Sequence, residues 1–300
     1  MSDFYLGLDV GGTASRWALA DASAAIVRRG SLGGATGHLF AEGPRENFIR
    51  MIEGVAVALD GVKPAGVFAG VTGLGPGAYA EAKTIISPRL GIAPDAIWLD
   101  DDIVLAYRAA FQPGEGHLVS AGTGSIGMHV DAEGRMIRVG GRGLLIDDGG
   151  SGTWIALTAL DRMFRLIDEH GTPKGAEILA DAVAAAVGGE GWDAVRAYIY
   201  GSDRGRIGML ATNIAEAANA GDPLALAVLA DAGRELARLA QALSGRVGPR
   251  PVAFIGGIVS LHPVIVETLS ASLPGTKLVF PRIDAAARAA ALARDFSITG

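Results

Sequence analysis

The stretch LGLDVGGTASRWALAD, residues 6–21, decides the fold class of this chain. Residues 4–8 form an apolar run that predicts a buried strand, residues 9–13 predict a tight turn, and residues 15–20 alternate as a second strand does. The chain therefore opens with a hairpin whose turn is rich in glycine. Strands that end in such turns, with helical patterns following, are typical of α/β proteins.

This first turn has the composition of a phosphate-binding site. Gly11 and Gly12 would let backbone amides approach an anion closely, and Thr13 would add a hydroxyl. Asp9 could hold a magnesium ion or its waters, because a hard cation prefers carboxylate oxygen. Taken alone, the same pattern also fits an ordinary hairpin turn, since Asp-x-Gly-Gly suits a positive φ without any ligand.

The same opening returns about 112 residues later, in LVSAGTGSIGM from Leu118. Residues 117–121 predict a strand and residues 126–130 a second one, which indicates an internal duplication. The turn between them offers a further set of amide and hydroxyl donors from Gly122, Thr123, Gly124 and Ser125. Two such turns, one in each half, are what a phosphate clamp working from two sides requires, so the pair is more specific than either turn alone.

The duplication predicts two domains, residues 1–112 and 113–300. Pro113 and Gly114 interrupt a predicted helix at residues 103–111 and mark the boundary. Beyond Trp154 the second domain is predicted to carry a helical insertion. A last helix, at about residues 286–300, would pack back on the first domain.

Candidate catalytic carboxylates follow the predicted strand at residues 96–99, in LDDDIVLAYRAAF. A kinase needs one carboxylate to accept the proton of the attacking hydroxyl. Asp100, Asp101 and Asp102 all stand at the start of a helix, where two of the three are expected to be N-caps only. The residue pattern leaves open which of them is the base.

Two further glycine-rich segments are candidates for binding a ligand. GGRGLLIDDGGSGTWIAL, from Gly140, contains Asp147 and Asp148 and fits a ligand-ordered loop and a plain capped loop equally well. In VAFIGG, a strand ends in Gly256 and Gly257, where the backbone could lie against an adenine or a ribose.

Composition excludes several other classes of protein. The net charge is -6 with no basic stripe, so nucleic acid is not an expected partner. The N-terminus lacks the pattern of a signal peptide and no apolar run is long enough for a membrane span, which favours the cytoplasm. The absence of cysteine excludes disulfides and a protein-ligated iron–sulfur cluster, and no Walker-type Gly-Lys-Ser/Thr motif is present.

These motifs, in this order and over nearly the whole chain, resemble the sugar kinase, heat-shock ATPase and actin superfamily. Within it, the chain is most similar to the N-acetylglucosamine and glucosamine kinases and the BadF/BadG/BcrA/BcrD-type ATPases, which share stretches such as AEAANAGDPLALAVL, from Ala215. The resemblance implies two RNase H-like domains of the duplicated actin-like ATPase fold with a cleft between them. It also implies ATP and Mg²⁺ as cofactors, a small-molecule sugar as substrate and a homodimer.

The resemblance also assigns roles to residues. The turn at residues 9–13 looks like the first phosphate motif, the turn at residues 122–125 like the second, and Gly256 with Gly257 like the adenosine motif. Asp102 best matches the catalytic aspartate, with Asp101 as the fallback. The contacts to sugar that it implies are His38, Asp102, Thr123, Gly143 and Asp148.

Three departures from the family surround the expected sugar pocket. His38 occupies the neighbourhood of a usual Asn, Arg142 stands where Gly-Trp-Gly is usual, and Gly149 stands where Glu is usual. The expected function is transfer of the ATP γ-phosphate to a hydroxyl of an amino sugar, at O6 of N-acetylglucosamine or glucosamine. The alternatives are a non-catalytic sugar or nucleotide sensor and a BadF-type ATPase without an iron–sulfur cluster.

Overall fold

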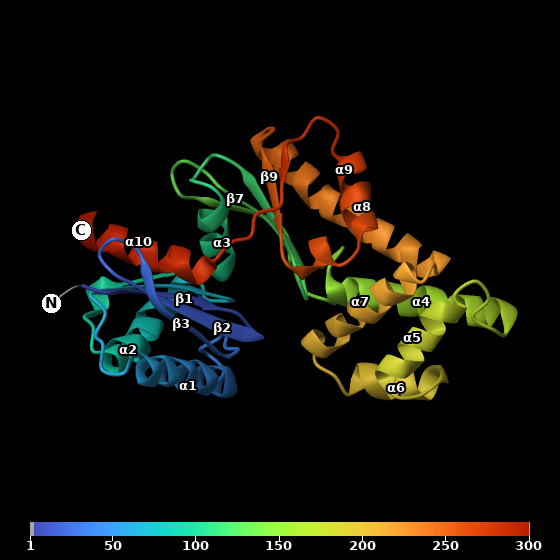
Figure 1. The fold of residues 1–300 in the computed structure, drawn as a ribbon, viewed down its shortest axis with the longest axis horizontal. Helices are drawn as coiled ribbons and strands as arrows, with labels where there is room; N and C mark the ends of the chain where they lie inside the picture. Colours follow the sequence, from blue (N-terminus) through green and yellow to red (C-terminus); the bar gives the residue numbers. More distant parts are fainter. Residues whose placement is uncertain (1–2, 300) are drawn as a thin grey trace. The chain divides into compact units, whose positions relative to one another are not determined.

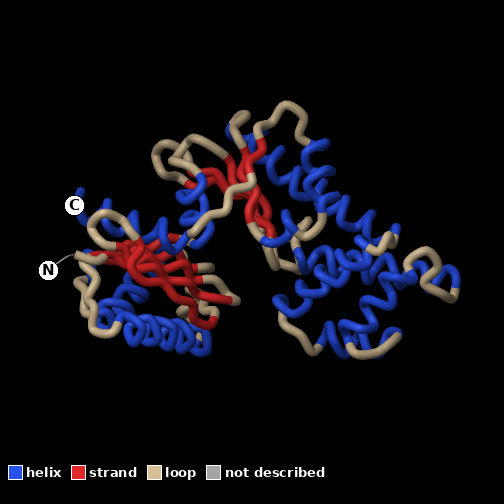
Figure 2. Tube along the Cα trace, in the orientation of Figure 1, coloured by secondary structure: helices blue, strands red, loops and turns tan. Residues whose placement is uncertain are grey.

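A computed structural model describes residues 3–299, and the contacts within it divide the chain into two units. Unit 1 contains the residues up to Phe111 together with those from Ile283 onward, and unit 2 contains Gln112–Arg282. Each unit has its own five-stranded mixed sheet (Figures 1 and 2). We propose that these units are the two domains predicted from the sequence, with the last helix returning to the first.

The sheet of unit 1 begins with the predicted hairpin. Its strands, in chain order, are β1 (Tyr5–Val10), β2 (Ala14–Ala20), β3 (Ile26–Gly33), β4 (Gly66–Val71) and β5 (Ile97–Asp100). Their order across the sheet is β3-β2-β1-β4-β5. The first three strands are antiparallel, whereas β1, β4 and β5 run parallel.

Helices cover both faces of this sheet. The buried side chains of β1 point alternately to one face and the other, so each face has its own core. Leu6, Leu8 and Val10 belong to the core beneath α1 (Glu42–Leu59) and α2 (Tyr79–Leu90). Tyr5 belongs to the core on the other face, beneath α10 (Ala285–Thr299), to which Leu105 of α3 (Asp102–Ala110) also contributes (Figure 1). Neither α2 nor β3 is predicted from the sequence.

Glycine allows α10 to approach the sheet closely. A Cβ on Gly7, in the middle of β1, would overlap with the backbone carbonyl oxygen of Ala286 and the backbone amide nitrogen of Ala290. Both atoms belong to the main chain of α10 and cannot turn away as a side chain can. The absence of a side chain at Gly7 is therefore a condition for the docking of α10.

The sheet of unit 2 repeats the topology of the first. Its strands are β6 (His117–Ala121), β7 (Ser125–Val130), β8 (Met136–Gly140), β9 (Val252–Ile255) and β10 (Leu278–Val279). They follow the order β10-β9-β6-β7-β8, so β6, β7, β8, β9 and β10 take the places of β1, β2, β3, β4 and β5. Strand directions agree as well, since β6–β7–β8 are antiparallel and β6–β9–β10 are parallel. The predicted internal duplication is confirmed.

The helical insertion of unit 2 lies between β8 and β9 (Figure 1). Its helices are α4 (Gly152–His170), α5 (Glu177–Val187), α6 (Gly191–Tyr200), α7 (Arg204–Asn219) and α8 (Pro223–Val247), and α9 (Pro263–Ser272) follows β9. Asp222 caps α8 by accepting a hydrogen bond from the amide of Ala225 at 2.9 Å. Within residues 3–299, no helix combines the length and the apolar character needed to cross a membrane.

Candidate active site

In unit 1 the predicted site residues gather at one edge of the sheet. Strands β1, β4 and β5 run parallel, so their carboxyl ends meet at the same edge. Ligands of open α/β sheets bind outside the carboxyl ends of the strands. Asp9 is next to last in β1, Thr72 follows β4, and Asp102 begins the helix that follows β5.

The first glycine-rich turn is held in place by the segment after β3. The amide of Gly11 donates to the carbonyl of Ala14, and the amide of Ala35 donates to the carbonyl of Gly11, both at 3.1 Å. Gly34 packs so closely on this turn that a Cβ there would overlap with the carbonyl of Gly12. Gly12 and Thr13 are themselves exposed, which leaves their donors available to an anion.

His38 is brought to the same edge through Thr72. The amide of Gly37 donates to the carbonyl of Thr72 at 2.8 Å, and a Cβ on Gly73 would touch the imidazole of His38 at 2.5 Å. His38 is exposed and its ring lies 5.8 Å from that of Phe40. His38, the expected sugar contact, thus lies beside the carboxyl end of β4. Thr72 at that end also forms a hydrogen bond with Asp102.

The three aspartates after β5 have separate environments. The carboxylate of Asp100 lies 3.8 Å from Nε of Arg108, and burial raises the pKa of Asp100. Asp101 is the N-cap of α3, because its side chain accepts a hydrogen bond from the amide of Ile103 at 3.1 Å. The expectation that some of these carboxylates serve as caps is confirmed for Asp101.

Asp102 has the most perturbed environment of the three. Burial raises its pKa to about 8, and its hydrogen bond to Asp101 and the negative charge of that neighbour add to the rise. A hydrogen bond from Thr72 lowers the pKa, and the charge of Asp9 raises it. A carboxyl group with a pKa near neutral, at a strand end beside a glycine-rich turn, has the properties of a general base.

Removing this carboxyl group should stabilise the protein most at high pH. The pKa of Asp102 is higher in the folded than in the unfolded protein, so the protonated carboxyl group stabilises the fold. This contribution to the unfolding free energy is fully present below the unfolded pKa near 3.9 and is lost as the pH rises through about 8. Asp102→Asn is therefore expected to gain about 1 to 2 kcal/mol of unfolding free energy relative to wild type between pH 6 and pH 8. Urea unfolding of both proteins at the two pH values measures this gain. A difference that does not change with pH would contradict it.

Asp9 is the candidate magnesium ligand. Its carboxylate lies 3.6 Å from Nη1 of Arg16 and its side chain is 21% exposed, while burial raises its pKa and the charge of Arg16 lowers it. Residues 3–299 contain no group of three or more acidic or histidine side chains that could hold a metal ion. Magnesium usually takes only one or two carboxylates and fills its other positions with water and substrate phosphates. Asp9 fits this role.

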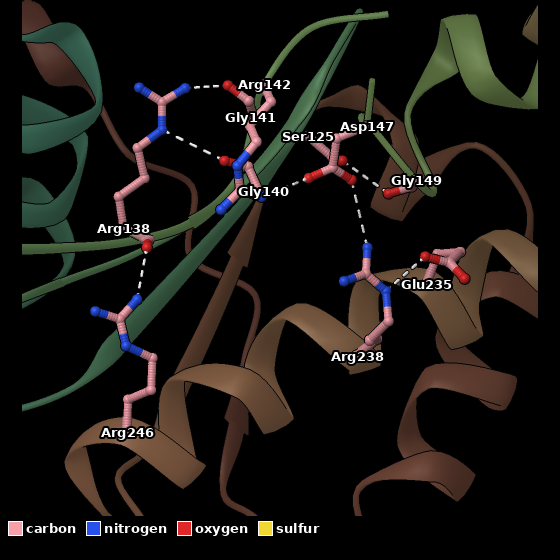
Figure 3. Close-up of polar contacts among 10 residues, drawn as sticks. All are labelled: Ser125, Arg138, Gly140, Gly141, Arg142, Asp147, Gly149, Glu235, Arg238 and Arg246. Carbon is pink, nitrogen blue, oxygen red and sulfur yellow. Dashed lines mark hydrogen bonds and ion pairs between the residues drawn. The ribbon is translucent and has the colours of Figure 1, made fainter. Parts of the chain in front are cut away.

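In unit 2 the second glycine-rich turn is held by the start of α4. The amide of Gly152 donates to the carbonyl of Gly122 at 2.9 Å, and Oγ1 of Thr153 donates to the carbonyl of Thr123 at 2.6 Å. Oγ of Ser125 donates to the carbonyl of Gly149 at 2.7 Å (Figure 3). The hydroxyl of Ser125 thus connects the turn to the loop before α4, and its contact with phosphate stays a prediction.

Gly256 and Gly257, the expected adenosine motif, lie at the same edge as this turn. Gly256 has φ of 96°, and a Cβ on it would overlap with the carbonyl of Ala121, the last residue of β6. Only glycine suits such a conformation this close to another main chain. Gly257 begins a short 3-10 helix and is exposed. Since β6 and β9 are parallel, the turn after each strand lies at the same edge.

In the loop between β8 and α4, Asp147 and Asp148 have different environments. Asp147 lies between two arginines, 3.3 Å from Nη1 of Arg142 and 3.4 Å from Nη2 of Arg238, and serves as the centre of an ion-pair network (Figure 3). Asp148 is buried, with 1% of its surface exposed. Gly143 turns the chain ahead of both, with φ of 91°.

Sequence reasoning missed the contribution of α7 to this site. A Cβ on Gly208 would lie 3.5 Å from the methyl of Thr123, and the guanidinium of Arg204 lies against Gly124. Neither residue belongs to a motif, and about 80 residues of chain separate them from the turn that they contact. No pattern in the sequence could have revealed the contact.

Two sheets of identical topology, each with a glycine-rich turn after its first strand, form the duplicated fold of the sugar kinase and actin type. The model of the BadF/BadG/BcrA/BcrD ATPase family matches residues 6–293, so the chain belongs to that family. The resemblance drawn from the sequence is confirmed.

Three relatives illustrate the similarity. A curated N-acetylmuramic acid/N-acetylglucosamine kinase from Clostridium acetobutylicum is 27% identical over 204 residues, which cover 65% of this chain and 66% of the relative, just under two thirds of its length. The structure of a candidate N-acetylglucosamine kinase from Chromobacterium violaceum has a TM-score of 0.75 at 23% identity and covers 97% of this chain and 99% of that one.

A ROK family glucokinase from Streptomyces griseus, solved with glucose and AMPPNP, has a TM-score of 0.61 at 17% identity, with 99% of this chain and 100% of that one covered. Structural similarity at 17% identity shows that the two proteins share a fold. It confirms the predicted fold class of two RNase H-like domains.

Proposed function

We propose that the protein is an ATP-dependent sugar kinase that acts on an amino sugar. The observation that carries the proposal is Asp102, a carboxyl group with a raised pKa at the strand edge of unit 1, next to the turn that would bind phosphate. Membership of an ATPase family and similarity to a curated N-acetylmuramic acid/N-acetylglucosamine kinase support it.

In the proposed reaction Asp102 accepts the proton of a sugar hydroxyl, and the hydroxyl oxygen forms a bond to the γ-phosphorus as the bond to the β-phosphate oxygen breaks. ATP would supply the phosphoryl group, and a magnesium ion held by Asp9 would neutralise part of its charge. Main-chain amides of the turns at residues 9–13 and 122–125 would donate to the phosphates. With a pKa of about 8, Asp102 would accept the proton in the ionised fraction of the enzyme, which grows as the pH rises through about 8.

The finer parts of the proposal concern the acceptor. We propose that the hydroxyl is O6 of N-acetylglucosamine or glucosamine, and that His38, Thr123 and Gly143 contribute to the sugar site. The cleft between the two domains, the homodimer and the cytoplasmic location also remain predictions.

A panel of acceptors tests the function. ADP release should be stimulated when glucosamine, N-acetylglucosamine, N-acetylmuramic acid or glucose is added to enzyme with magnesium and ATP, and an amino sugar should give the highest kcat/KM. Phosphorus–proton correlation NMR of the product then identifies the phosphorylated oxygen. If no sugar stimulates turnover but one binds, as calorimetry would show, the protein is a sensor and the kinase proposal is overturned.

A further inference from the structure

Arg204 lies directly on the second glycine-rich turn. It is the first residue of α7, and Asp203 before it caps the helix by accepting a hydrogen bond from the amide of Arg206 at 2.8 Å. A Cβ on Gly124 would overlap with Nη2 of Arg204. The guanidinium group thus covers the face of the turn that the missing side chain leaves open.

Asp148 holds this guanidinium in position. Its Oδ2 lies 2.9 Å from Nη2 of Arg204 and accepts no hydrogen bond of good geometry from the residues that the structure describes. A buried carboxylate without a partner is strongly unfavourable, so the ion pair with Arg204 compensates the charge of Asp148. Asp148 is the member of the pair that is held in place, because only 1% of its surface is exposed.

The backbone at Asp148 has a left-handed conformation, with φ of 71°, which Asp adopts more readily than most residues with a side chain. The turn is closed by a 3.0 Å hydrogen bond from the amide of Ser151, the N-cap of α4, to the carbonyl of Asp148. This turn and the burial of Asp148 fix where its carboxylate lies.

The guanidinium of Arg204 is partly open to solvent and can face a ligand. A guanidinium has five N–H donors in a planar fork, and Nη2 is the nitrogen that forms the ion pair with Asp148. The side chain of Arg204 is 45% exposed. An arginine already held by a carboxylate loses less conformational freedom when it binds an anion, and its fork matches phosphate oxygens.

We propose that Arg204 binds a phosphoryl group of the nucleoside triphosphate at the second glycine-rich turn, with Asp148 as the residue that positions it. This inference rests on the proposed function. It gives Asp148 a different role from the sugar contact that the family resemblance implies. The second turn itself offers only neutral amides and hydroxyls, so Arg204 would add a positive charge beside it.

Calorimetry with AMPPNP and with adenosine tests the proposal. Arg204→Gln is expected to weaken AMPPNP binding by about 10- to 100-fold, because a charge-assisted hydrogen bond is lost, and to leave adenosine binding unchanged. Arg204→Lys, which keeps the charge but not the fork, should recover part of the affinity. Arg206→Gln is the matched control on the same helix, since Arg206 stacks on the ring of Tyr198 at 4.8 Å, and should bind AMPPNP as wild type does.

The positioning role of Asp148 has its own measurement. Asp148→Asn should weaken AMPPNP binding as Arg204→Gln does, again without an effect on adenosine. Unchanged AMPPNP affinity in Arg204→Gln, or a loss confined to sugar binding, overturns the inference alone. A wild-type protein that binds no nucleotide overturns the proposed function and this inference with it. Circular dichroism of each variant confirms that it is folded before binding is measured.

Discussion

Replacing Asp102 by Asn is expected to lower kcat for sugar phosphorylation by about 10²- to 10⁴-fold, the range typical of a lost general base. The amide is nearly the same size as the carboxyl group but cannot accept the proton. Nucleotide binding should persist, because the donors proposed for the phosphates are main-chain amides and Arg204. Steady-state kinetics with the acceptor found in the panel, together with AMPPNP calorimetry, measure both quantities.

Asp101→Asn is the matched control for this experiment. Asn is as good an N-cap as Asp, so α3 should remain intact. Since Asp101 is engaged by the amide of Ile103, its replacement should reduce kcat far less than the replacement of Asp102. If the two variants behave in the opposite way, Asp101 is the base and the assignment made here is wrong.

Replacing Gly7 by Ala is expected to cause the largest loss of stability. The added methyl would meet main-chain atoms of Ala286 and Ala290, so α10 would have to move away from the sheet. Overpacking of a core costs about 1 to 3 kcal/mol and occasionally more, and a contact with backbone places this substitution at the upper end. We expect the unfolding free energy to fall by about 3 kcal/mol, as urea unfolding would show.

Gly33→Ala provides the comparison. Gly33 also lies in a strand of unit 1, at the end of β3, and a Cβ there meets no atom within 4 Å. Its replacement should change the unfolding free energy by less than about 0.5 kcal/mol, as exposed substitutions commonly do. Equal stability of the two variants would show that α10 does not depend on Gly7. Limited proteolysis adds a local measurement, since a displaced α10 should become susceptible to cleavage.

The sequence predicted the elements that carry strong local signals. The two hairpins, the strand before Gly256 and the cap at Asp101 each depend on residues that are neighbours in the chain. Strand β3 escaped prediction because it is polar and half exposed, with Arg28 and Arg29 at its centre. The apolar content of an edge strand is too low to distinguish it from a loop.

Contacts between distant segments could not be predicted. Asp147 and Asp148 are adjacent and chemically identical, and only the fold places Asp147 between two arginines and buries Asp148 against Arg204. The pKa of Asp102 likewise depends on burial, on Asp9 in β1, which raises it, and on Thr72 after β4, which lowers it. Local patterns identify the candidates for a site, whereas their roles are decided by three-dimensional neighbours.

The place of α10 in the chain has a consequence for how the protein is made. Unit 1 consists of two pieces, and Gln112–Arg282 is synthesised between them. While the ribosome is still producing that middle part, β1 presents an uncovered face at Gly7, and Phe68 in β4 lacks the helix that completes its core. Unit 2 can therefore finish folding before unit 1 does. A nascent chain that stops before residue 283 should hold unit 1 in an exposed, aggregation-prone state.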